Sequence, residues 1–355
     1  MKILVFGGTG AMGAPLVKLL NKKSSNKIYV TSRSYHPNSG NIVYIQGNAQ
    51  ADKAFVKKIL LKHQYDVLVD FMVYDSSTLK QRLNLYLNHT NQYIFFSSSR
   101  VYASSTSPLI ESSPRLLDVC KDKTYLATDE YALAKAREED ILINSGKNNW
   151  TIIRPYITYN SRRIQLGVYE KENWLYRAMK GRSIIFPLDI ADKYTNLTFG
   201  PDVAKNLIKL IGNKDAYGKI FHIVNNENIK WRDIADLYKD IVYKVTGNQI
   251  DIQYVKNSKE LQTVWNPWQI KYDRLYNRVF DSSKIIKLTG EPSYVSVEEG
   301  LTNCLTAFLN DPKWLDYRMN WAYEAWSDKQ THSLTNLSEI NGKRNKLRYL
   351  KHRFL

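Results

Sequence analysis

Short apolar runs alternate with amphipathic segments along the first half of the chain. The apolar runs predict strands at 2–6, 28–31, 42–46, 67–71, 93–97 and 151–154, and the segments between them predict helices near 11–22, 51–63, 76–88 and 126–145. Strands that are apolar on both faces and separated by helices are typical of a parallel sheet covered on both sides. The pattern therefore predicts an α/β fold with a doubly wound sheet, whose ligands would bind beyond the carboxyl ends of the strands.

The pattern becomes looser after residue 160. Amphipathic periodicity predicts further helices near 168–180, 202–211 and 231–246, and the stretch 103–123, rich in Ser, Pro and charge, is expected to be a surface loop. We expect three parts: a nucleotide-binding domain at 1–160, a smaller α/β substrate lobe mainly at 161–310, and an aromatic and basic extension at 311–355. Some segments of the second part are expected to return to the first.

A glycine-rich turn follows the first predicted strand directly. Gly7, Gly10 and Gly13 have the spacing GxxGxxG within the run GGTGAMG, and an amphipathic helix follows. The first glycine permits a tight turn, the second lets the backbone approach a pyrophosphate, and the third lets the helix pack closely on the strand. The helix would direct its free N–H groups at the phosphate.

A second motif lies farther along the chain. Tyr131 and Lys135 lie four positions apart on a predicted helix, so the phenol and the ammonium can face one site. A nearby ammonium favours the phenolate and suits the tyrosine to proton transfer. The strand at 93–97 ends in hydroxyl groups, at Ser97, Ser98 and Ser99.

Taken together, these motifs give the chain a family resemblance. From residue 1 to about 310 it resembles the extended short-chain dehydrogenase/reductase family, particularly the nucleotide-sugar epimerases, dehydratases and reductases. The resemblance rests on the glycine turn, the Ser-Ser-x-x-Val-Tyr strand end at 97–102, the Tyr131/Lys135 pair, the runs RPYITY at 154–159 and FGPDVA at 199–204, and a weaker match at 281–290. It implies a Rossmann-type first domain and an oxidoreductase that is often dimeric.

The resemblance also implies catalytic roles. Counting back from Val101 assigns the hydroxyl that binds the reacting oxygen to Ser98, with Ser97 and Ser99 as the other choices. Tyr131 would be the acid/base, and Lys135 would support it and hold the nicotinamide ribose. The cofactor would then exchange a hydride with the sugar.

The end of the second predicted strand bears on the cofactor. The run VTSRS at 30–34 has no acid but contains Arg33, which suits a 2′-phosphate, so NADP(H) is favoured and NAD(H) remains possible. Asn48 replaces a usual Asp, and Phe71-Met72 replace two small residues. The full set of predicted cofactor-binding residues is Gly7, Thr9, Gly10, Ala11, Met12, Gly13, Ser32, Arg33, Asn48, Ala49, Phe71, Tyr131, Lys135 and Pro155.

Substrate residues are less well defined. Dehydratases of the family place Asp-Glu where this chain has Ser99 and Arg100, and a guanidinium cannot serve as a general acid. This favours epimerisation or carbonyl reduction of a nucleotide-activated sugar, as in surface glycan biosynthesis. The predicted substrate-binding residues are Ser99, Arg100, Tyr159, Arg162, Arg163, Arg274 and Arg278, the arginines as a diphosphate clamp. No metal site is predicted.

Composition limits the remaining possibilities. A formal charge of +17 exceeds what a diphosphate needs. It suggests attraction to an anionic substrate, to nucleic acid or to a membrane surface. Alternatively, the composition rich in lysine and asparagine reflects only the base bias of the genome. Cys120 and Cys304 form no pattern, and we expect a cytoplasmic protein without signal peptide or membrane span. The aromatic stretch 314–326 and the cations of 343–355 are interpreted as a packed helix with a solvated tail, or alternatively as a peripheral contact with the inner membrane surface.

Two other functions stay open. Plastid stem-loop RNA-binding relatives keep this fold without catalysis, and Asn48, Phe71-Met72 and the positive charge are features shared with that branch. Tyr131 and Lys135 are both present here, however, so nucleic acid is the less favoured partner. A regulator that senses the dinucleotide without sugar chemistry is the third interpretation.

Overall fold

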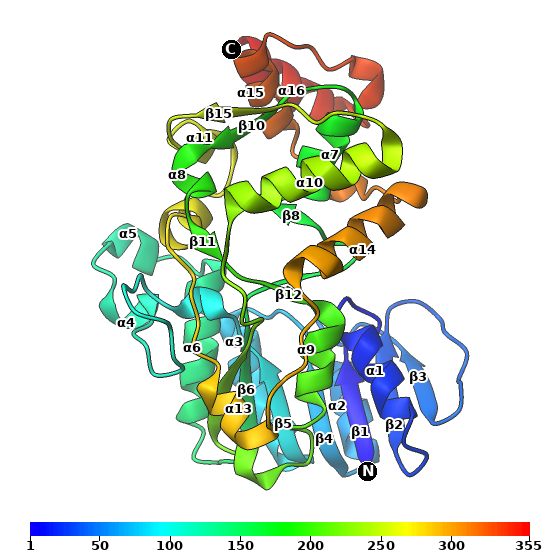
Figure 1. Cartoon of the computed structure of the whole chain (residues 1–355). Coiled ribbons are helices and arrows are strands. Elements are labelled where there is room, and N and C mark those ends of the chain that lie inside the picture. Colours follow the sequence, from blue (N-terminus) through cyan, green and yellow to red (C-terminus); the bar gives the residue numbers. More distant parts are fainter.

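Seven parallel strands form the sheet in the lower half of Figure 1, in the computed structural model, which describes residues 1–355. The order β13-β6-β5-β4-β1-β2-β3 places the first strand in the middle. All four apolar residues that end β1 are fully buried, which suits this central position. The strands are β1 (Lys2–Phe6), β2 (Lys27–Ser32), β3 (Ile42–Gln46), β4 (Tyr65–Asp70), β5 (Thr90–Phe96), β6 (Trp150–Pro155) and β13 (Lys219–Ile223).

Helices cover both faces of the sheet, as the sequence predicted. One face packs on α1 (Gly13–Asn21), α9 (Gly200–Leu207) and α13 (Ser283–Thr289), and the other on α2 (Lys53–Lys62), α3 (Ser76–Asn88) and α6 (Tyr131–Ile143). The carboxylates of Asp52 and Asp75 cap α2 and α3 by accepting backbone N–H bonds. The sheet order reverses at β1, and in doubly wound folds ligands bind at such a point.

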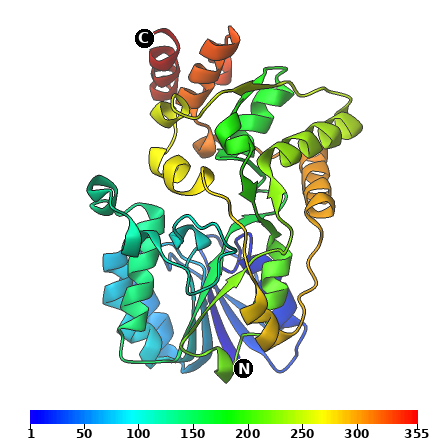
Figure 2. The ribbon, with the colours of Figure 1, turned by 60° about the vertical axis from the view of Figure 1, so that its left-hand side comes forward.

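A second lobe lies above the carboxyl ends of the strands (Figures 1 and 2). It has the largest apolar core of the molecule, in which the rings of Trp174 and Tyr238 stack at 4.6 Å. Its elements are β7 (Ile157–Tyr159), β8 (Gln165–Leu166), β9 (Tyr169–Glu170), α7 (Lys171–Met179), β10 (Ile184–Pro187), α8 (Leu188–Ala191), β11 (Tyr194–Thr195), β12 (Leu197–Phe199), β14 (Ile229–Lys230), α10 (Trp231–Thr246), β15 (Ile252–Val255), α11 (Leu261–Val264), α12 (Pro267–Gln269) and α14 (Val297–Asn310).

Two features of the sheet domain differ from the predicted elements. The seventh strand, β13, was not predicted individually, because its run KIFHI is short and half exposed at its start. It pairs with β6 from Lys219 to Ile223 and forms one edge of the sheet. The stretch 103–123 is not wholly a loop, since it contains the short helix α4 (Leu116–Val119) and leads into α5 (Lys123–Leu126).

The C-terminal segment is a packed helical pair and not a solvated tail. Helices α15 (Trp321–Thr331) and α16 (Lys343–Phe354) lie against each other at the top of Figure 1. Tyr349 of α16 is fully buried, and its hydroxyl donates a 2.6 Å hydrogen bond to Asp328 of α15. The expectation of a solvated tail was therefore wrong, because one buried tyrosine at mid-helix anchors the basic sequence.

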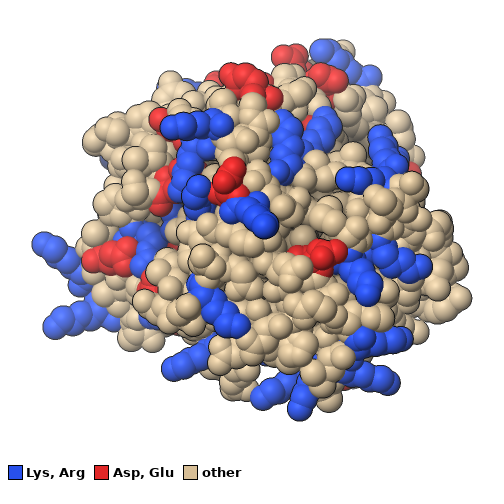
Figure 3. Space-filling view, turned by 90° about the horizontal axis from the view of Figure 1, so that it is seen from below, with Lys and Arg blue, Asp and Glu red and all other residues tan.

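Exposed lysines crowd the amino-terminal edge of the sheet. Figure 3 shows this face, on which Lys and Arg outnumber Asp and Glu. The exposed lysines at or just before the starts of the strands are Lys22, Lys23, Lys27, Lys62, Lys147, Lys214 and Lys219. Much of the excess positive charge therefore lies at the end of the sheet opposite to the glycine turn. No helix has the length and apolar character that a membrane span requires.

Candidate active site

The glycine turn connects β1 to α1 at the centre of the sheet. Gly7 has a φ of +75°, which a residue with a side chain rarely adopts. A Cβ atom on Gly13 would lie 2.4 Å from the carbonyl oxygen of Gly7, so only glycine lets the helix pack this closely. The amide of Gly10 closes the turn by donating to the carbonyl of Gly7 at 3.0 Å.

This turn leaves backbone donors without a partner. The N–H groups of Ala11, Met12 and Gly13 make no hydrogen bond within the protein, and no side chain caps the N-terminus of α1. Unpaired N–H groups and the positive end of the helix dipole form an anion site. The turn therefore has the backbone geometry that a pyrophosphate requires.

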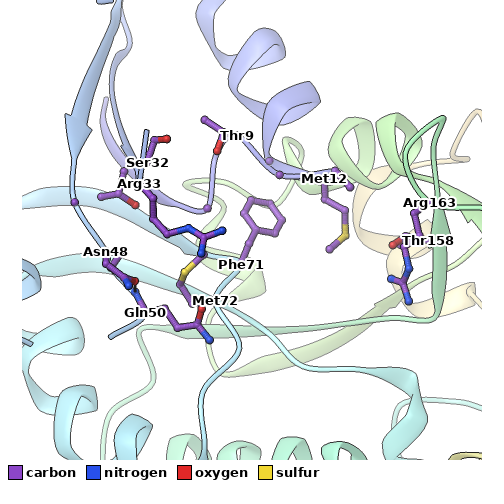
Figure 4. A pocket seen from close by; sticks show the side chains of 17 residues that line it. Thr9, Met12, Ser32, Arg33, Asn48, Gln50, Phe71, Met72, Thr158 and Arg163 are labelled. Atoms are coloured by element: carbon purple, nitrogen blue, oxygen red, sulfur yellow. Dashed lines mark hydrogen bonds between the residues drawn. The ribbon is translucent and has the colours of Figure 1, made fainter. Parts of the chain in front are cut away.

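A pocket of about 310 Å³ opens beside the turn (Figure 4). Arg33 and Asn48 lie at one end of it, Thr158 and Arg163 lie at the other, and Phe71 lies between them. Its full lining is Gly7, Thr9, Gly10, Ala11, Met12, Gly13, Thr31, Ser32, Arg33, Gly47, Asn48, Ala49, Gln50, Phe71, Met72, Thr158 and Arg163.

Eleven of the predicted cofactor residues line this pocket, whereas Tyr131, Lys135 and Pro155 do not. Pro155 is buried at the end of β6. Sequence reasoning missed Thr31, Gly47, Gln50 and Thr158. A signal for Gly47 was present, because it directly follows an apolar strand. A Cβ atom there would lie 2.2 Å from the ring of Phe55.

Two large side chains stand where small residues were expected. The terminal methyl of Met72 would lie 2.5 Å from a Cβ atom on Gly7, so it packs against the turn itself. The ring of Phe71 lies 4.3 Å from that of Phe96 at the end of β5. These two side chains thus form an apolar wall between the glycine turn and the serines that follow β5.

Of these serines, only Ser98 keeps its hydroxyl proton free. Ser97 donates to Glu139 at 2.5 Å, and Ser99 donates to the carbonyl oxygen of Arg154 at 2.9 Å. Ser98 accepts a bond from the backbone N–H of Arg100 and donates none within the protein. It is also the residue that the motif spacing selected.

A buried ion pair fixes α6 against the ends of the strands. The guanidinium of Arg154 on β6 contacts both carboxylate oxygens of Glu139 on α6, at 2.7 and 2.6 Å. Ser97 donates to the same carboxylate. A bidentate ion pair of this kind restricts the relative orientation of the two side chains as well as their distance. The helix that carries Tyr131 is therefore held to β5 and β6.

Tyr131 is the first residue of α6, and 36% of it is exposed to solvent. The preceding Glu130 caps the helix by accepting from the backbone N–H of Ala132. The guanidinium carbon of Arg100 lies 5.3 Å from the centroid of the Tyr131 ring. Tyr131 and Arg100 thus lie side by side, next to the turn that begins at Ser98.

Lys135 points into the protein. It is 1% exposed, and its ammonium lies 2.8 Å from Glu138 and 4.6 Å from the centroid of the Phe95 ring. Burial raises the pKa of Glu138 to about 7, although Lys135 opposes this shift. Burial also raises the pKa of Asp70, at the end of β4, to about 6. Lys135 therefore lies among carboxyl groups whose pKa values are raised by burial.

Four predicted substrate residues occupy interior positions. Ser99 is fully buried, and Tyr159 is 2% exposed in the core of the second lobe. Arg274 and Arg278 are 2% and 1% exposed, and both are paired with the buried Asp273. The guanidinium groups of Arg274 and Arg278 are thus engaged within the protein, which disfavours these two arginines as members of the expected diphosphate clamp.

The other predicted arginines lie nearer to solvent. Arg163 lines the pocket and contacts Glu170 at 3.2 Å, and Arg162 is exposed beside the glycine turn. Arg100 keeps 14% of its side chain exposed. Of the predicted arginines, these three remain placed to meet a ligand.

The chain is similar to several known proteins. The chain is 26% identical over 250 residues to the chloroplast stem-loop binding protein of 41 kDa b from Arabidopsis thaliana, covering 66% of this chain and 61% of that relative. It is 21% identical over 375 residues to dTDP-glucose 4,6-dehydratase 1 of Escherichia coli K12, covering 93% and 98%. The structure of UDP-glucuronic acid 4-epimerase from Bacillus cereus, with UDP-glucuronic acid and NAD, matches with a TM-score of 0.66 at 16% identity, covering 88% and 100%.

A family model identifies the chain more directly. The model of the NAD dependent epimerase/dehydratase family matches residues 3–223. This match spans more than half of the chain, and the protein therefore belongs to that family. The Rossmann-like fold predicted from the sequence is confirmed by the seven-stranded parallel sheet.

Proposed function

We propose that this member of the NAD dependent epimerase/dehydratase family is an NAD(P)-dependent epimerase or ketoreductase that acts on a nucleotide-activated sugar. One observation supports the proposal: the backbone anion site at the glycine turn lies at the same edge of the sheet as a free serine hydroxyl and an accessible tyrosine. Ser98, Tyr131 and the glycine turn all lie at the carboxyl edge of one sheet. In the proposed role the product would enter surface glycan biosynthesis.

Tyr131 and Ser98 have different roles in the proposed reaction. When bound, the nicotinamide accepts a hydride from a sugar carbon or returns one to it. The hydroxyl of Tyr131 gives or takes the proton on the oxygen of that carbon, and the free hydroxyl of Ser98 donates a hydrogen bond to the same oxygen. The buried ion pair between Arg154 and Glu139 fixes the helix that carries Tyr131 relative to the strand ends near Ser98.

The proposed cofactor is NADP(H) in preference to NAD(H). Arg33 follows β2, and Figure 4 shows its side chain directed across the pocket. The residues that end β2 and follow it, Thr31 to Ser34, include no carboxylate that would hold the ribose hydroxyls. A guanidinium there supports binding of a 2′-phosphate.

The surroundings of Tyr131 favour epimerisation or reduction over loss of water. The position after Ser98 holds Ser99, whose hydroxyl donates to a backbone carbonyl, and the next position holds Arg100. Neither can protonate a leaving hydroxyl. The carboxylate of Glu130 accepts from Arg100, Tyr125 and a backbone N–H, so it is occupied as an acceptor.

Product analysis tests the proposal. The purified protein, with NAD⁺ or NADP⁺ and a panel of nucleotide hexoses, should form an epimer that NMR identifies. With the reduced cofactor and a nucleotide-linked keto sugar it should form an alcohol. Absence of both products across the panel would contradict the proposal.

Nucleic-acid binding without sugar chemistry is the second candidate. The stem-loop binding relative and the lysines at the amino-terminal edge of the sheet favour it. RNA binding at this edge should weaken steeply with salt. Charge reversal at Lys22, Lys27 and Lys219 should abolish it while leaving the free energy of unfolding unchanged.

We also propose that the basic helix α16 contacts an anionic membrane surface. Its exposed side chains include cations and apolar groups, namely Lys343, Arg344, Leu347, Arg348, Lys351 and Phe354. Such a face suits peripheral contact with anionic lipid.

A further inference from the structure

Arg100 lies beside the proposed proton-transfer residue. It follows β5 within the short helical turn η1 (Ser99–Val101), and its backbone N–H donates to the hydroxyl oxygen of Ser98 at 3.2 Å. Its guanidinium carbon lies 5.3 Å from the centroid of the Tyr131 ring. A sugar whose reacting oxygen contacts both Ser98 and Tyr131 would therefore present its neighbouring substituents to this guanidinium.

The protein uses only part of the guanidinium. Nη2 donates to Glu130 at 2.7 Å, whereas Nε lies 3.6 Å from Asp273, too far for a hydrogen bond, and has no other partner. Nη1 makes no hydrogen bond within the protein and is not among the buried atoms. Arg100 therefore keeps at least one accessible donor for a ligand.

The carboxylates around Arg100 are already shared with other donors. Asp273 accepts from Tyr156 and Arg278 and also pairs with Arg274. Three arginines (Arg100, Arg274 and Arg278) thus face two carboxylates (Asp273 and Glu130), which leaves one positive charge in excess. A partly buried cation with a free donor favours an anionic partner, because a charge-assisted hydrogen bond is strongest away from water.

We propose that Arg100 binds a carboxylate on the sugar ring, so that the substrate class is nucleotide-activated uronic acids. This inference rests on the proposed function. The exocyclic carbon of a hexose is close to the ring carbons whose hydroxyls are oxidised, and in a uronic acid it carries the only negative charge on the sugar. A neutral hexose would leave Nη1 without a charged partner.

Paired ligands that share one nucleotide test the inference. Calorimetry with the cofactor-loaded protein compares UDP-glucuronate with UDP-glucose, and UDP-galacturonate with UDP-galactose. The wild type should bind each acid at least about tenfold more tightly than its neutral partner, because a hydrogen bond to a charged group is stronger than one to a neutral group. Arg100→Gln should remove this preference by weakening the acids alone. Arg100→Lys should keep part of it, and Arg344→Gln, on the exposed face of α16, is the matched control.

The outcomes separate the inference from the proposed function. Equal binding of acid and neutral sugar by the wild type would overturn the inference and leave the proposed function standing. Equal weakening of both ligands in Arg100→Gln would do the same, since it would place Arg100 at the shared diphosphate or in a structural role. If no nucleotide sugar binds to the wild type, the proposed function fails and the inference fails with it. Should Arg100→Gln not fold, the wild-type comparison alone decides.

Discussion

The ammonium of Lys135 lies 2.8 Å from the carboxylate of Glu138, one turn along the same helix, and both side chains are buried. The second oxygen of Glu138 is buried without a hydrogen-bond partner. A carboxylate in this environment is held in its charged form mainly by the adjacent cation, and burial opposes that form. Glu138 therefore orients Lys135 at some cost in stability.

The first prediction concerns this cost. The pKa of Glu138 is raised from 4.5 to about 7, so the folded protein binds a proton more tightly than the unfolded chain, and stability falls as pH rises through that window. Glu138→Gln resembles the protonated form. It should match the wild type near pH 5 and exceed it by about 2 kcal/mol near pH 8. Denaturant unfolding at both pH values measures the difference. A difference that does not change with pH would contradict the assignment.

The second prediction concerns cofactor choice. Arg33→Ala removes the cation at the end of β2, so NADPH affinity should fall about tenfold or more while NADH affinity stays nearly constant. Calorimetric titration with both cofactors measures this, and Arg344→Ala on the exposed face of α16 is the control. If the wild type binds NADH as tightly as NADPH, the preference for the phosphorylated cofactor is wrong.

The third prediction concerns the helical pair α15/α16. Tyr349→Ala should cost about 3–5 kcal/mol in the free energy of unfolding, because it empties a buried site. Tyr349→Phe removes only the bond to Asp328 and the acceptor for Thr335, and should cost about 1 kcal/mol. Urea unfolding of the full chain is the measurement. A fully tolerated alanine would show that α16 does not stabilise the fold.

The fourth prediction concerns contact with anionic lipid. Deleting 343–355 would remove Tyr349 as well, so charge reversal on the exposed face is the cleaner test. Arg344→Glu with Lys351→Glu should abolish sedimentation with phosphatidylserine vesicles at low salt and leave unfolding unchanged. If the wild type does not sediment with these vesicles, α16 has only its packing role.

Local patterns in the sequence predicted the sheet, and they also selected eleven of the residues that line the pocket beside the glycine turn. The glycine turn and the apolar strands depend on backbone geometry within a few residues, and Arg33 directly follows one of these strands, so the local sequence carries the information. Motif spacing also selected Ser98, the one serine of three whose proton stays free.

Contacts between residues far apart in the sequence could not be predicted from local patterns. Asp273 lies far along the chain from Arg100, and nothing in either local sequence indicates that Arg274 and Arg278 are buried against this carboxylate. The strand β13 became part of the sheet through its pairing with β6. The pairing of Glu138 with Lys135 likewise depends on the burial of both side chains. Their spacing of three positions is visible in the sequence, but their burial is not.

Turnover of Tyr131→Phe tests the central claim most directly. The variant keeps the ring beside Arg100 and removes the transferable proton, so conversion of a nucleotide sugar should fall by about two to four orders of magnitude while cofactor binding persists. Tyr317→Phe, at a residue that is 79% exposed, should convert the sugar at the wild-type rate. Conversion by Tyr131→Phe at a rate close to that of the wild type would contradict the proposed role of Tyr131 as the acid/base of a nucleotide-sugar enzyme.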